Sequence, residues 1–588
     1  MQFMIRQSLL IFILLGLILS VVFFRIIPAQ SAQTKTITIL ETSDLHGNLM
    51  PWDYFANQPA EWGLARIVTL VQQERAKNPN LLLIDDGDTI QGTPLANYYN
   101  EVDTQSPHPI AEAFNVLGFD AVTLGNHDFD FGVEVLSRWT QQLQAPVLCA
   151  NVVKPSGEPA YLPYLIKSVN GVKVGILGLT TTGVTNWLPA SNFGQFSFTD
   201  PVATAQKYVP QMRAEGADVI VIAQHTGWAK APKQRSHPTA WLEDPKTWVS
   251  RGSTTPGENV TIELAQRVPG VDVILAGHSH LNVPQAVVND VLIAEPSYWG
   301  KALSKFTIQL QQRDKVWKVI SKTATNLSVE GVEPAKDFVE QFQMAHQQTL
   351  DYINQPIGQA KGQFVGGMAA RLHNSPLASL INTVQSKAAA AAGYPVDFAI
   401  TSIFRNQGEL PAGEITLRHA YGVYIYDNRL FVLEITGEIL RQALEHNAAY
   451  FQQIDPQALK QNSLSSPREV VAENQRSYNW DLYSEIDYTI DVTRPLGQRV
   501  TRLKFRGKPV TPEQTFRVAL NNYRALGGGG YSMFKQAKVI WQSTQEIREL
   551  VAAHIAQQAT LDPKDYTTDN FQLIPDLYQY FFRCSTSD

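Results

Sequence analysis

The feature that most limits the fold of this chain is a repeated alternation of short apolar runs with longer amphipathic stretches. The apolar runs are rich in Leu, Ile and Val, and several stretches between them have the pattern of helices. The runs are TITILE, NLLLIDDGD, FDAVTLGNHD, KVGILGLT, DVIVIAQHTG and VDVILAGHSH. Uninterrupted apolar runs separated by helices are typical of strands buried on both faces of a sheet. The first half of the chain is therefore predicted to have an α/β fold.

Two large domains are expected, because 588 residues are too many for one ordinary domain. The alternation fades after residues 303–310, and a glutamine-rich segment with the pattern of an amphipathic helix follows. We therefore expect a first domain over residues 33–335, a linker helix over 336–360 and a second domain over 361–588.

Composition excludes several classes of protein. A hydrophobic content of 44% and a charged content of 17% are typical of a globular chain, and a net charge of −6 argues against a protein that coats nucleic acid. The two cysteines, Cys149 and Cys584, cannot form a disulfide framework or a thiolate metal site. We expect two free thiols, and a single bridge between them is the alternative.

The N-terminal segment has the layout of an export signal. Arg6 precedes an uncharged apolar run over residues 8–24, and the small residues Ala29, Ser31 and Ala32 follow. The run is long for a signal and slightly short for a membrane span. Residues 1–32 are therefore expected to be a signal peptide cleaved after Ser31 or Ala32, or else an uncleaved anchor that attaches the protein to a membrane. Both alternatives predict an exported protein, periplasmic or on the cell surface.

Side chains of the metal-ligand type follow directly after five of the apolar runs. The candidates are Asp44, His46, Asp88, Asn126, His225, His278 and His280. The carboxyl ends of strands in an open α/β sheet form the edge at which ligands bind. Residues two apart in an extended chain also share a face, so each D-x-H or H-x-H pair can point at one centre. Each residue alone would more often be a surface residue, a core residue or a turn, but that explanation would have to hold at all five strand ends.

The number and chemistry of these candidates favour two metal ions. One tetrahedral ion uses about four protein ligands at most, so seven candidates imply two ions that share a bridging carboxylate. Imidazole and oxygen ligands without thiolates suit zinc, manganese, iron or cobalt better than a calcium site. We therefore predict a site for two divalent transition-metal ions.

The same segments carry a resemblance to a known family. SDLHGN, DDGDTIQG, LGNHDFD, AQHTG and AGHSH resemble, in chain order, the signature blocks of calcineurin-like dimetal phosphoesterases, and GNHDFD is similar to the 5'-nucleotidase branch. ITGEILRQALEHNA, YNWDLYSEIDYTIDVTRPLGQRV and ALNNYRALGGGGYSMF are most similar to the 2',3'-cyclic-nucleotide 2'-phosphodiesterase/3'-nucleotidase subgroup. The resemblance implies an N-terminal phosphoesterase sandwich of two sheets flanked by helices. It also implies a C-terminal α+β substrate-binding domain of the 5'-nucleotidase type.

The resemblance also implies roles for particular residues. The implied ligands of the first ion are Asp44, His46, Asp88 and His280. The implied ligands of the second ion are Asp88, Asn126, His225 and His278, with Asp88 bridging. His127 and Asp130 are the implied catalytic pair. The residues implied to lie around the substrate are Tyr426 and Tyr523, which would sandwich the base, with Arg405 and Asn428 near them. On its own pattern, Tyr426 would instead be an ordinary strand residue.

The expected function is that of an exported dimetal hydrolase that acts on nucleoside 2',3'-cyclic phosphates and 3'-nucleotides through attack by metal-activated water. Nucleotides are the expected partners, and neither a nucleic-acid polymer nor a protein partner is implied. A 5'-nucleotidase or nucleotide-sugar hydrolase is the nearer alternative, because residues 400–416 lack a glycine–arginine pair that we associate with the cyclic phosphodiesterases. A nucleotide-binding surface protein without turnover is the remote alternative. The long segment over residues 227–259 either shapes access to the metals or is a surface loop.

Overall fold

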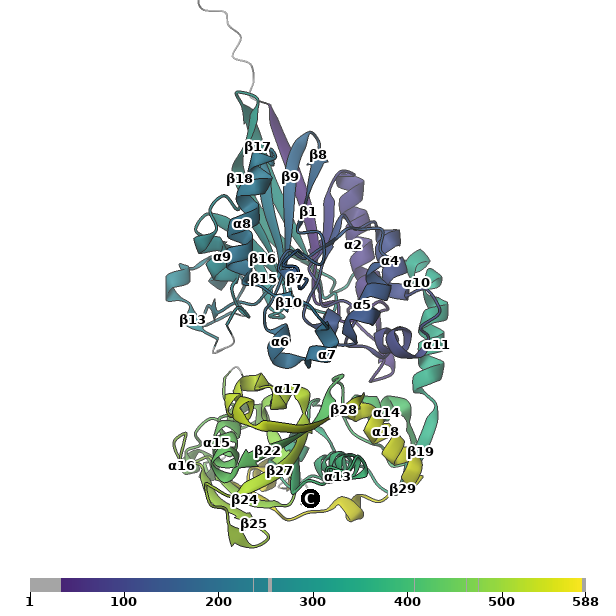
Figure 1. Ribbon diagram of the computed structural model, residues 1–588, viewed down its shortest axis with the longest axis vertical. Coiled ribbons are helices and arrows are strands. Elements are labelled where there is room, and N and C mark those ends of the chain that lie inside the picture. The colour runs from purple at the N-terminus through teal and green to yellow at the C-terminus, as the bar shows by residue number, and fades with distance from the viewer. Residues whose placement is uncertain are drawn as a thin grey trace, which may run out of the picture.

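The computed structural model describes residues 33–235, 237–251, 256–406, 408–461, 463–473 and 475–583. Figure 1 shows two bodies, with helices α10 (Lys336–Gln341) and α11 (Gln343–Ile353) running along one side between them. The predicted signal or anchor over residues 1–32 and the second cysteine, Cys584, lie outside the described residues. Within the described part, no helix is long and apolar enough to cross a membrane. Cys149 is buried and free, as predicted.

The N-terminal body is a sandwich of two six-stranded sheets. The first sheet has the order β18-β17-β1-β4-β5-β6 and the second has the order β15-β16-β14-β11-β9-β8. The strands of the first sheet are β1 (Thr34–Thr42), β4 (Leu82–Asp85), β5 (Ala121–Thr123), β6 (Val147–Leu148), β17 (Ala302–Arg313) and β18 (Val316–Ser328). The strands of the second sheet are β8 (Tyr164–Val169), β9 (Val172–Thr180), β11 (Val219–His225), β14 (Val273–Ala276), β15 (Asn282–Val288) and β16 (Val291–Pro296).

The predicted apolar runs form the parallel centres of these two sheets. Strand β1 pairs in parallel with β4, which pairs with β5, and β11 lies in parallel between β9 and β14. The facing sides of the sheets share one core, in which Ile39 and Ile84 of the first sheet and Val221 and Val273 of the second are fully buried or nearly so. Helices α2 (Leu64–Lys77), α4 (Pro109–Leu117), α8 (Pro201–Ala214) and α9 (Thr261–Arg267) contribute to the outer cores. The predicted sandwich flanked by helices is confirmed.

The C-terminal body is an α+β domain. Its largest sheet has five strands in the order β23-β20-β27-β22-β28, and smaller sheets have the orders β26-β25-β24-β30 and β21-β19-β29. The five strands are β20 (Phe398–Ser402), β22 (Arg429–Thr436), β23 (Asp481–Tyr483), β27 (Thr515–Asn521) and β28 (Lys538–Glu546). The smaller sheets consist of β24 (Ile486–Asp491), β25 (Val500–Phe505), β26 (Lys508–Pro509) and β30 (Phe571–Ile574), and of β19 (Pro356–Ala360), β21 (Gly413–Thr416) and β29 (Thr560–Leu561). This arrangement confirms the predicted class of the second domain.

Local sequence signals set the bounds of the helices in this domain. Helix α13 (Pro376–Ala391) begins after Ser375, whose hydroxyl accepts a hydrogen bond from the amide of Ala378. It ends just before Gly393, which has the left-handed backbone conformation that stops a helix. Helices α15 (Gly437–Ala448) and α18 (Ile547–Gln558) add buried residues to the same core as the sheets.

The segment between the domains contains two helices rather than one. Helices α10 and α11 occupy residues 336–353, and β19 follows them and pairs with β21 and β29 of the C-terminal body. In Figure 1, the short helices α6 (Val184–Trp187) and α7 (Ala190–Phe193) lie at the end of the N-terminal body that faces α17 (Asn522–Ala525). His46, which follows β1, and His278, which follows β14, line a cleft that residues of the C-terminal body also line, so these strand-end residues lie between the two bodies.

Candidate metal and substrate site

The chain leaves the sandwich through tight turns at the strand ends, and these turns carry the predicted ligands. Five of the seven candidates have a left-handed backbone conformation, which is uncommon for residues other than glycine. They are Asp44 (φ 52), His46 (φ 47), Asp88 (φ 55), His278 (φ 70) and His280 (φ 56). Such conformations persist only where the surrounding structure holds them, and they cluster at functional sites.

Neighbouring backbone holds these turns together. The amide of Asp44 donates to the carbonyl of Gly87, and the amide of His46 donates to the carbonyl of Asp88, both at 2.9 Å. Gly125 is required next to them, because a Cβ atom there would lie 2.1 Å from Asp88 Oδ1. The glycines between the strands and the polar residues therefore permit close approach of one loop to the next.

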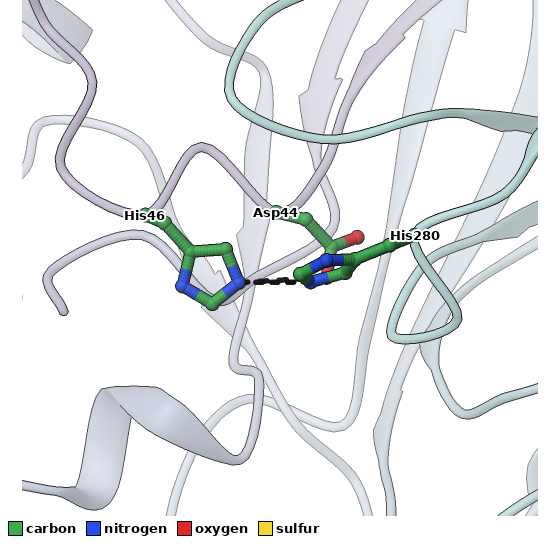
Figure 2. A group of neighbouring side chains, drawn as sticks. All are labelled: Asp44, His46 and His280. Carbon is green, nitrogen blue, oxygen red and sulfur yellow. Dashed lines mark hydrogen bonds and ion pairs between the residues drawn. The ribbon is translucent and has the colours of Figure 1, made fainter. Parts of the chain in front are cut away.

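Figure 2 shows the first group of candidate ligands, in which Asp44 follows β1, His46 comes two residues later and His280 follows β14. The Nε2 atoms of His46 and His280 are 3.0 Å apart. Asp44 Oδ1 lies 3.2 Å from His280 Nε2 and 4.0 Å from His46 Nε2. The three side chains thus point at one small volume, and their potential ligand atoms all lie within 4.8 Å of one another.

The second group contains Asp88, His225 and His278, whose potential ligand atoms also lie within 4.8 Å of one another. Asp88 Oδ2 is 3.0 Å from His225 Nε2 and 3.8 Å from Nε2 of His46, which belongs to the first group. The Asp88 carboxylate therefore faces both groups, which is the position that a bridging ligand needs. Asn126 comes shortly after β5, and its nearly buried side chain borders the same space.

Two backbone carbonyls orient the imidazole rings. His225 Nδ1 lies 2.6 Å from the carbonyl oxygen of Asp86, and His46 Nδ1 lies 3.1 Å from that of Gln91. Because a carbonyl oxygen only accepts hydrogen bonds, each Nδ1 is the donor, and in the neutral ring each Nε2 is left with a lone pair. Burial lowers the pKa of His46 to about 4, despite the opposing charge of Asp88, so this ring is neutral at physiological pH. Neutral imidazole is the form that binds metals.

The carboxylates at the centre attract positive charge. Burial alone would lower the pKa of His225, but the charges of Asp88 and Asp44 outweigh it and raise that pKa. Burial alone would likewise raise the pKa of Asp44, but the charges of His225 and His280 outweigh it, and the pKa falls to about 2. Ionised carboxylates that face imidazole nitrogens inside a protein form a favourable site for a cation.

The chemistry of the donor set fits two divalent transition-metal ions. Asn126 Oδ1 is buried and has no hydrogen-bond partner among the described residues. A buried polar atom of this kind is costly unless it is satisfied, and metal coordination would satisfy it. The set combines imidazole nitrogens with carboxylate and amide oxygens, and it contains no thiolate.

His127 and Asp130 form a hydrogen-bonded pair beside this centre. His127 Nδ1 lies 2.8 Å from Asp130 Oδ2, and the amide of His127 donates to Asp88 Oδ1 at 2.7 Å. Burial works to lower the pKa of His127, but the charges of Asp130 and Asp88 outweigh it and raise the pKa to about 9. Both side chains line the cleft between the domains.

This cleft has a volume of about 760 Å³ and is lined by residues of both domains. Among the metal-ligand candidates, those on its wall are His46, Asp88, Asn126, His278 and His280. The four residues predicted to surround a substrate also line it, namely Arg405, Tyr426, Asn428 and Tyr523. The structure therefore brings the predicted residues of the two domains to one space, which is large enough for a nucleotide-sized ligand.

A third tyrosine packs beside the two predicted ones. The ring centroid of Tyr478 is 6.2 Å from that of Tyr426 and 6.1 Å from that of Tyr523, and its plane is nearly perpendicular to both. The sequence analysis did not single out Tyr478, although it lies in the YNWD segment that carries part of the resemblance. Arg405 extends across the cleft, where its Nη2 lies 3.5 Å from Asp53 Oδ2 and its guanidinium carbon is 5.2 Å from the ring centre of Phe55.

Sequence reasoning also missed aromatic and charged neighbours of the histidines. Trp187 stacks on His278 with ring centroids 5.4 Å apart, and Tyr298 stacks on His280 at 4.8 Å. Glu258 Oε1 lies 3.6 Å from His278 Nε2, and Arg251 lines the same cleft. Tyr298 follows strand β16, so extending the strand-end rule to aromatic residues would have found it.

Comparison with known proteins agrees with this geometry. Residues 37–282 match the calcineurin-like phosphoesterase family, and residues 356–536 match the 5'-nucleotidase C-terminal domain. A 2',3'-cyclic-nucleotide 2'-phosphodiesterase/3'-nucleotidase of Haemophilus influenzae is 30% identical over 90% of this chain and 86% of its own length. The trifunctional nucleotide phosphoesterase protein YfkN of Bacillus subtilis is 31% identical over 93% of this chain. YfkN is much longer, and this chain spans only 39% of its length.

A solved structure shares the same two-domain fold. A Staphylococcus aureus protein described as a candidate 5'-nucleotidase, in complex with alpha-ketoglutarate, superimposes with a TM-score of 0.76 and 24% identity, covering 92% of this chain and 100% of its own. This likeness establishes the architecture, and the Haemophilus influenzae relative establishes the family. The chain therefore belongs to the calcineurin-like metallophosphoesterases of the 5'-nucleotidase family, and it is a phosphoric ester hydrolase.

Proposed function

We propose that this protein is an exported dimetal hydrolase that converts nucleoside 2',3'-cyclic phosphates and 3'-nucleotides to nucleoside and phosphate. One observation carries the proposal: members of two groups of metal-ligand side chains and a set of tyrosine rings line one cleft between two domains. The name of the Haemophilus influenzae relative supports the choice of substrate class. Nucleotides are the proposed partners of the cleft.

The proposed metal ligands are the seven residues at the strand ends. Asp44, His46, Asp88 and His280 would hold one ion, and Asp88, Asn126, His225 and His278 would hold the other. A pair of divalent ions supplies an activated water nucleophile at neutral pH and neutralises charge on the phosphoryl oxygens. Zinc, manganese, iron and cobalt all suit this donor set.

His127 is proposed as the general acid of the reaction. Its Nδ1 is held by Asp130, so the other ring nitrogen is the one free to act on a substrate in the cleft that the ring lines. A proton donated from Nε2 to the departing sugar oxygen would neutralise the charge that develops there. Asp130 keeps the ring in one orientation and favours its protonated form.

The C-terminal domain is proposed to bind the nucleoside. A base stacked between Tyr426 and Tyr523 would gain about 1–3 kcal/mol, whichever base it is, because every base has a π-face. Arg405 and Asn428 lie on the wall of the same cleft, close enough to contact the substrate. We propose domain limits of 33–335 and 361–588 with a linker over 336–360, and export directed by residues 1–32, which precede the first strand.

A substrate panel tests this function directly. Phosphate release is measured from 2',3'-cyclic AMP, 3'-AMP and 5'-AMP at equal concentrations, with added Mn²⁺ or Zn²⁺ and in parallel with excess chelator. We expect the cyclic and 3'-substrates to be hydrolysed faster than 5'-AMP, and all activity to disappear with the chelator. Preference for 5'-AMP would replace the proposed substrate class but leave the dimetal hydrolase in place. Nucleotide binding without any phosphate release would contradict the enzymatic role itself.

A further inference from the structure

The segment that follows His225 is not a plain surface loop. We call residues 228–258 the tryptophan loop, of which the structure describes residues 228–235, 237–251 and 256–258. Trp228, Trp241 and Trp248 are buried, and their ring centroids lie 5.0, 5.3 and 5.9 Å apart. Three packed indole rings join the outer core of the second sheet, which fixes the conformation of this segment.

The tryptophan loop folds back on itself as a short hairpin. Strand β12 (Lys230–Ala231) pairs antiparallel with β13 (Val249–Ser250), and the amide of Arg251 donates to the carbonyl of Ala229 at 3.0 Å. This pairing returns the chain from the end of β13 to a point beside Trp228, close to the start of the loop. Arg251 and Trp228 thereby reach the same neighbouring segment.

That neighbouring segment is the turn that carries two of the proposed metal ligands. Ser279, between His278 and His280, accepts a hydrogen bond from Arg251 Nη1 at 2.7 Å and one from the amide of Trp228 at 3.0 Å. A Cβ atom on Gly227 would lie 2.8 Å from the same serine oxygen, so the approach is as close as a glycine allows. Both of the groups that donate hydrogen bonds to the Ser279 hydroxyl therefore belong to the tryptophan loop.

A second connection joins the tryptophan loop to the end of the same turn. The indole nitrogen of Trp228 donates to Glu295 Oε2 at 2.7 Å, and Glu295 Oε1 accepts from the amide of Leu281 at 2.8 Å. Glu295 is fully buried, so these bonds lie away from water, where a hydrogen bond is electrostatically stronger. The turn is therefore held at Ser279 and again at Leu281.

The turn needs such support because His278 and His280 both have left-handed backbone conformations. Left to itself, a turn of this kind would relax towards more common conformations and move the two imidazole rings off their common centres. We propose that the tryptophan loop holds His278 and His280 in the geometry that binds metal, and that Arg251 is a positioning residue that acts through Ser279. The inference rests on the proposed metal site and adds a determinant of its affinity. Groups that orient metal ligands typically change metal affinity by about ten- to a hundredfold when they are removed.

The test compares Arg251→Gln with Lys246→Gln in the full chain. Lys246 is an exposed residue of the same loop, so its substitution removes the same charge without touching the turn. Metal content is measured by mass spectrometry after loading with Zn²⁺, and the rate of metal loss is followed in excess chelator. We expect Arg251→Gln to lose metal about tenfold faster than wild type or more, and Lys246→Gln to lose it at the wild-type rate.

Further variants separate positioning from general damage. Ser279→Ala removes the acceptor from the other side of the contact. The double variant with both Arg251→Gln and Ser279→Ala should lose metal no faster than the more affected single variant, because both changes break the same interaction. Arg251→Lys should restore part of the affinity. The melting temperature of the metal-free protein should differ little between wild type and Arg251→Gln, whereas the rise on adding Zn²⁺ should be smaller for the variant.

Two results would overturn the inference, and they are distinguishable. Equal rates of metal loss from wild type and Arg251→Gln would overturn it alone, and a raised KM for 3'-AMP in that variant would then assign Arg251 to substrate binding. A wild-type protein that takes up no metal would overturn the proposed metal site and this inference with it.

Discussion

The Nε2 atoms of His46 and His280 lie 3.0 Å apart, although the two residues are separated by 234 positions in the sequence (Figure 2). His46 donates its Nδ1 proton to the carbonyl of Gln91, so its Nε2 lone pair faces the ring of His280. A lone pair this close to a second imidazole nitrogen is stabilised by a positive charge between the two rings, either a proton or a metal ion. With Asp44 Oδ1 only 3.2 Å from His280 Nε2, the arrangement favours a cation shared by all three side chains.

Single-ligand variants should lose metal in different proportions. Wild type loaded with Zn²⁺ or Mn²⁺ should hold about two ions per chain, as expected for a dimetal site. His280→Ala should retain about one ion, since it disrupts the first group only, whereas Asp88→Asn should lose most of both, because Asp88 faces both groups. Metal content measured by mass spectrometry decides this, and equal content in all three proteins would count against the assignment.

His127→Asn should lower kcat without removing the metals. If Nε2 of His127 donates a proton to the leaving oxygen, the loss should be on the order of a hundredfold or more. Asp130→Asn should have a smaller effect, because it removes only the partner that orients the ring. Steady-state kinetics with 3'-AMP at saturating metal give both values. Wild-type kcat in His127→Asn would assign the proton transfer to another group.

Tyr523→Ala should weaken substrate binding far more than Tyr523→Phe. The alanine variant loses a stacking surface worth about 1–3 kcal/mol, so KM should rise about five- to 150-fold. The phenylalanine variant keeps the ring and loses only the hydroxyl, which accepts a hydrogen bond from the amide of Gly529. A similar KM for all three proteins would show that the base binds elsewhere in the cleft.

His108 should make the protein less stable at acid pH. It is buried at the start of α4 and bonds Asn100, and burial lowers its pKa to about 3. In the unfolded chain the pKa of this histidine is about 6.5. At a pH between the folded and unfolded pKa values, His108 is protonated in the unfolded state but not in the folded state. The free energy of unfolding therefore falls as the pH falls. The loss at pH 5 should be about 2 kcal/mol.

Thermal unfolding at pH 7.5 and pH 5 measures this effect. His108→Asn keeps a side chain that can cap a helix but cannot titrate, so its melting temperature should fall less between the two pH values. Chelator is present throughout, so that metal binding does not contribute to the difference. An identical fall in wild type and variant would assign the acid sensitivity to other groups.

The fold and the metal-ligand candidates could be predicted because both follow from local pattern. Buried parallel strands produce continuous apolar runs, and the carboxyl ends of neighbouring strands meet at one edge of their sheet. Asp44 and Asp88, and likewise His225 and His278, could therefore be placed together without knowing the connections between them. The arrangement of strands into two facing sheets came from the family resemblance, because periodicity does not reveal which strands pair.

Other parts of the site depend on contacts that no local pattern encodes. Arg251 reaches Ser279 only because a hairpin and three indole rings fold the tryptophan loop back on itself. Tyr478 meets Tyr426 and Tyr523 through the packing of a loop against two strand ends of the C-terminal domain. Arg405 lines the cleft, but its link to Asp53 joins two domains and could not be inferred from either one.

The division of the cleft between two bodies has a consequence for substrate selection. The proposed metal ligands come from one body, and the rings proposed to face a base come from the other. The two bodies are joined by α10 and α11 along one side (Figure 1). On this proposal, the span from phosphorus to base would be set by the docking of the two bodies and not by any one side chain. Substitutions in the connecting helices, remote from every reacting atom, would be a route by which this scaffold changes the ester position that it cleaves.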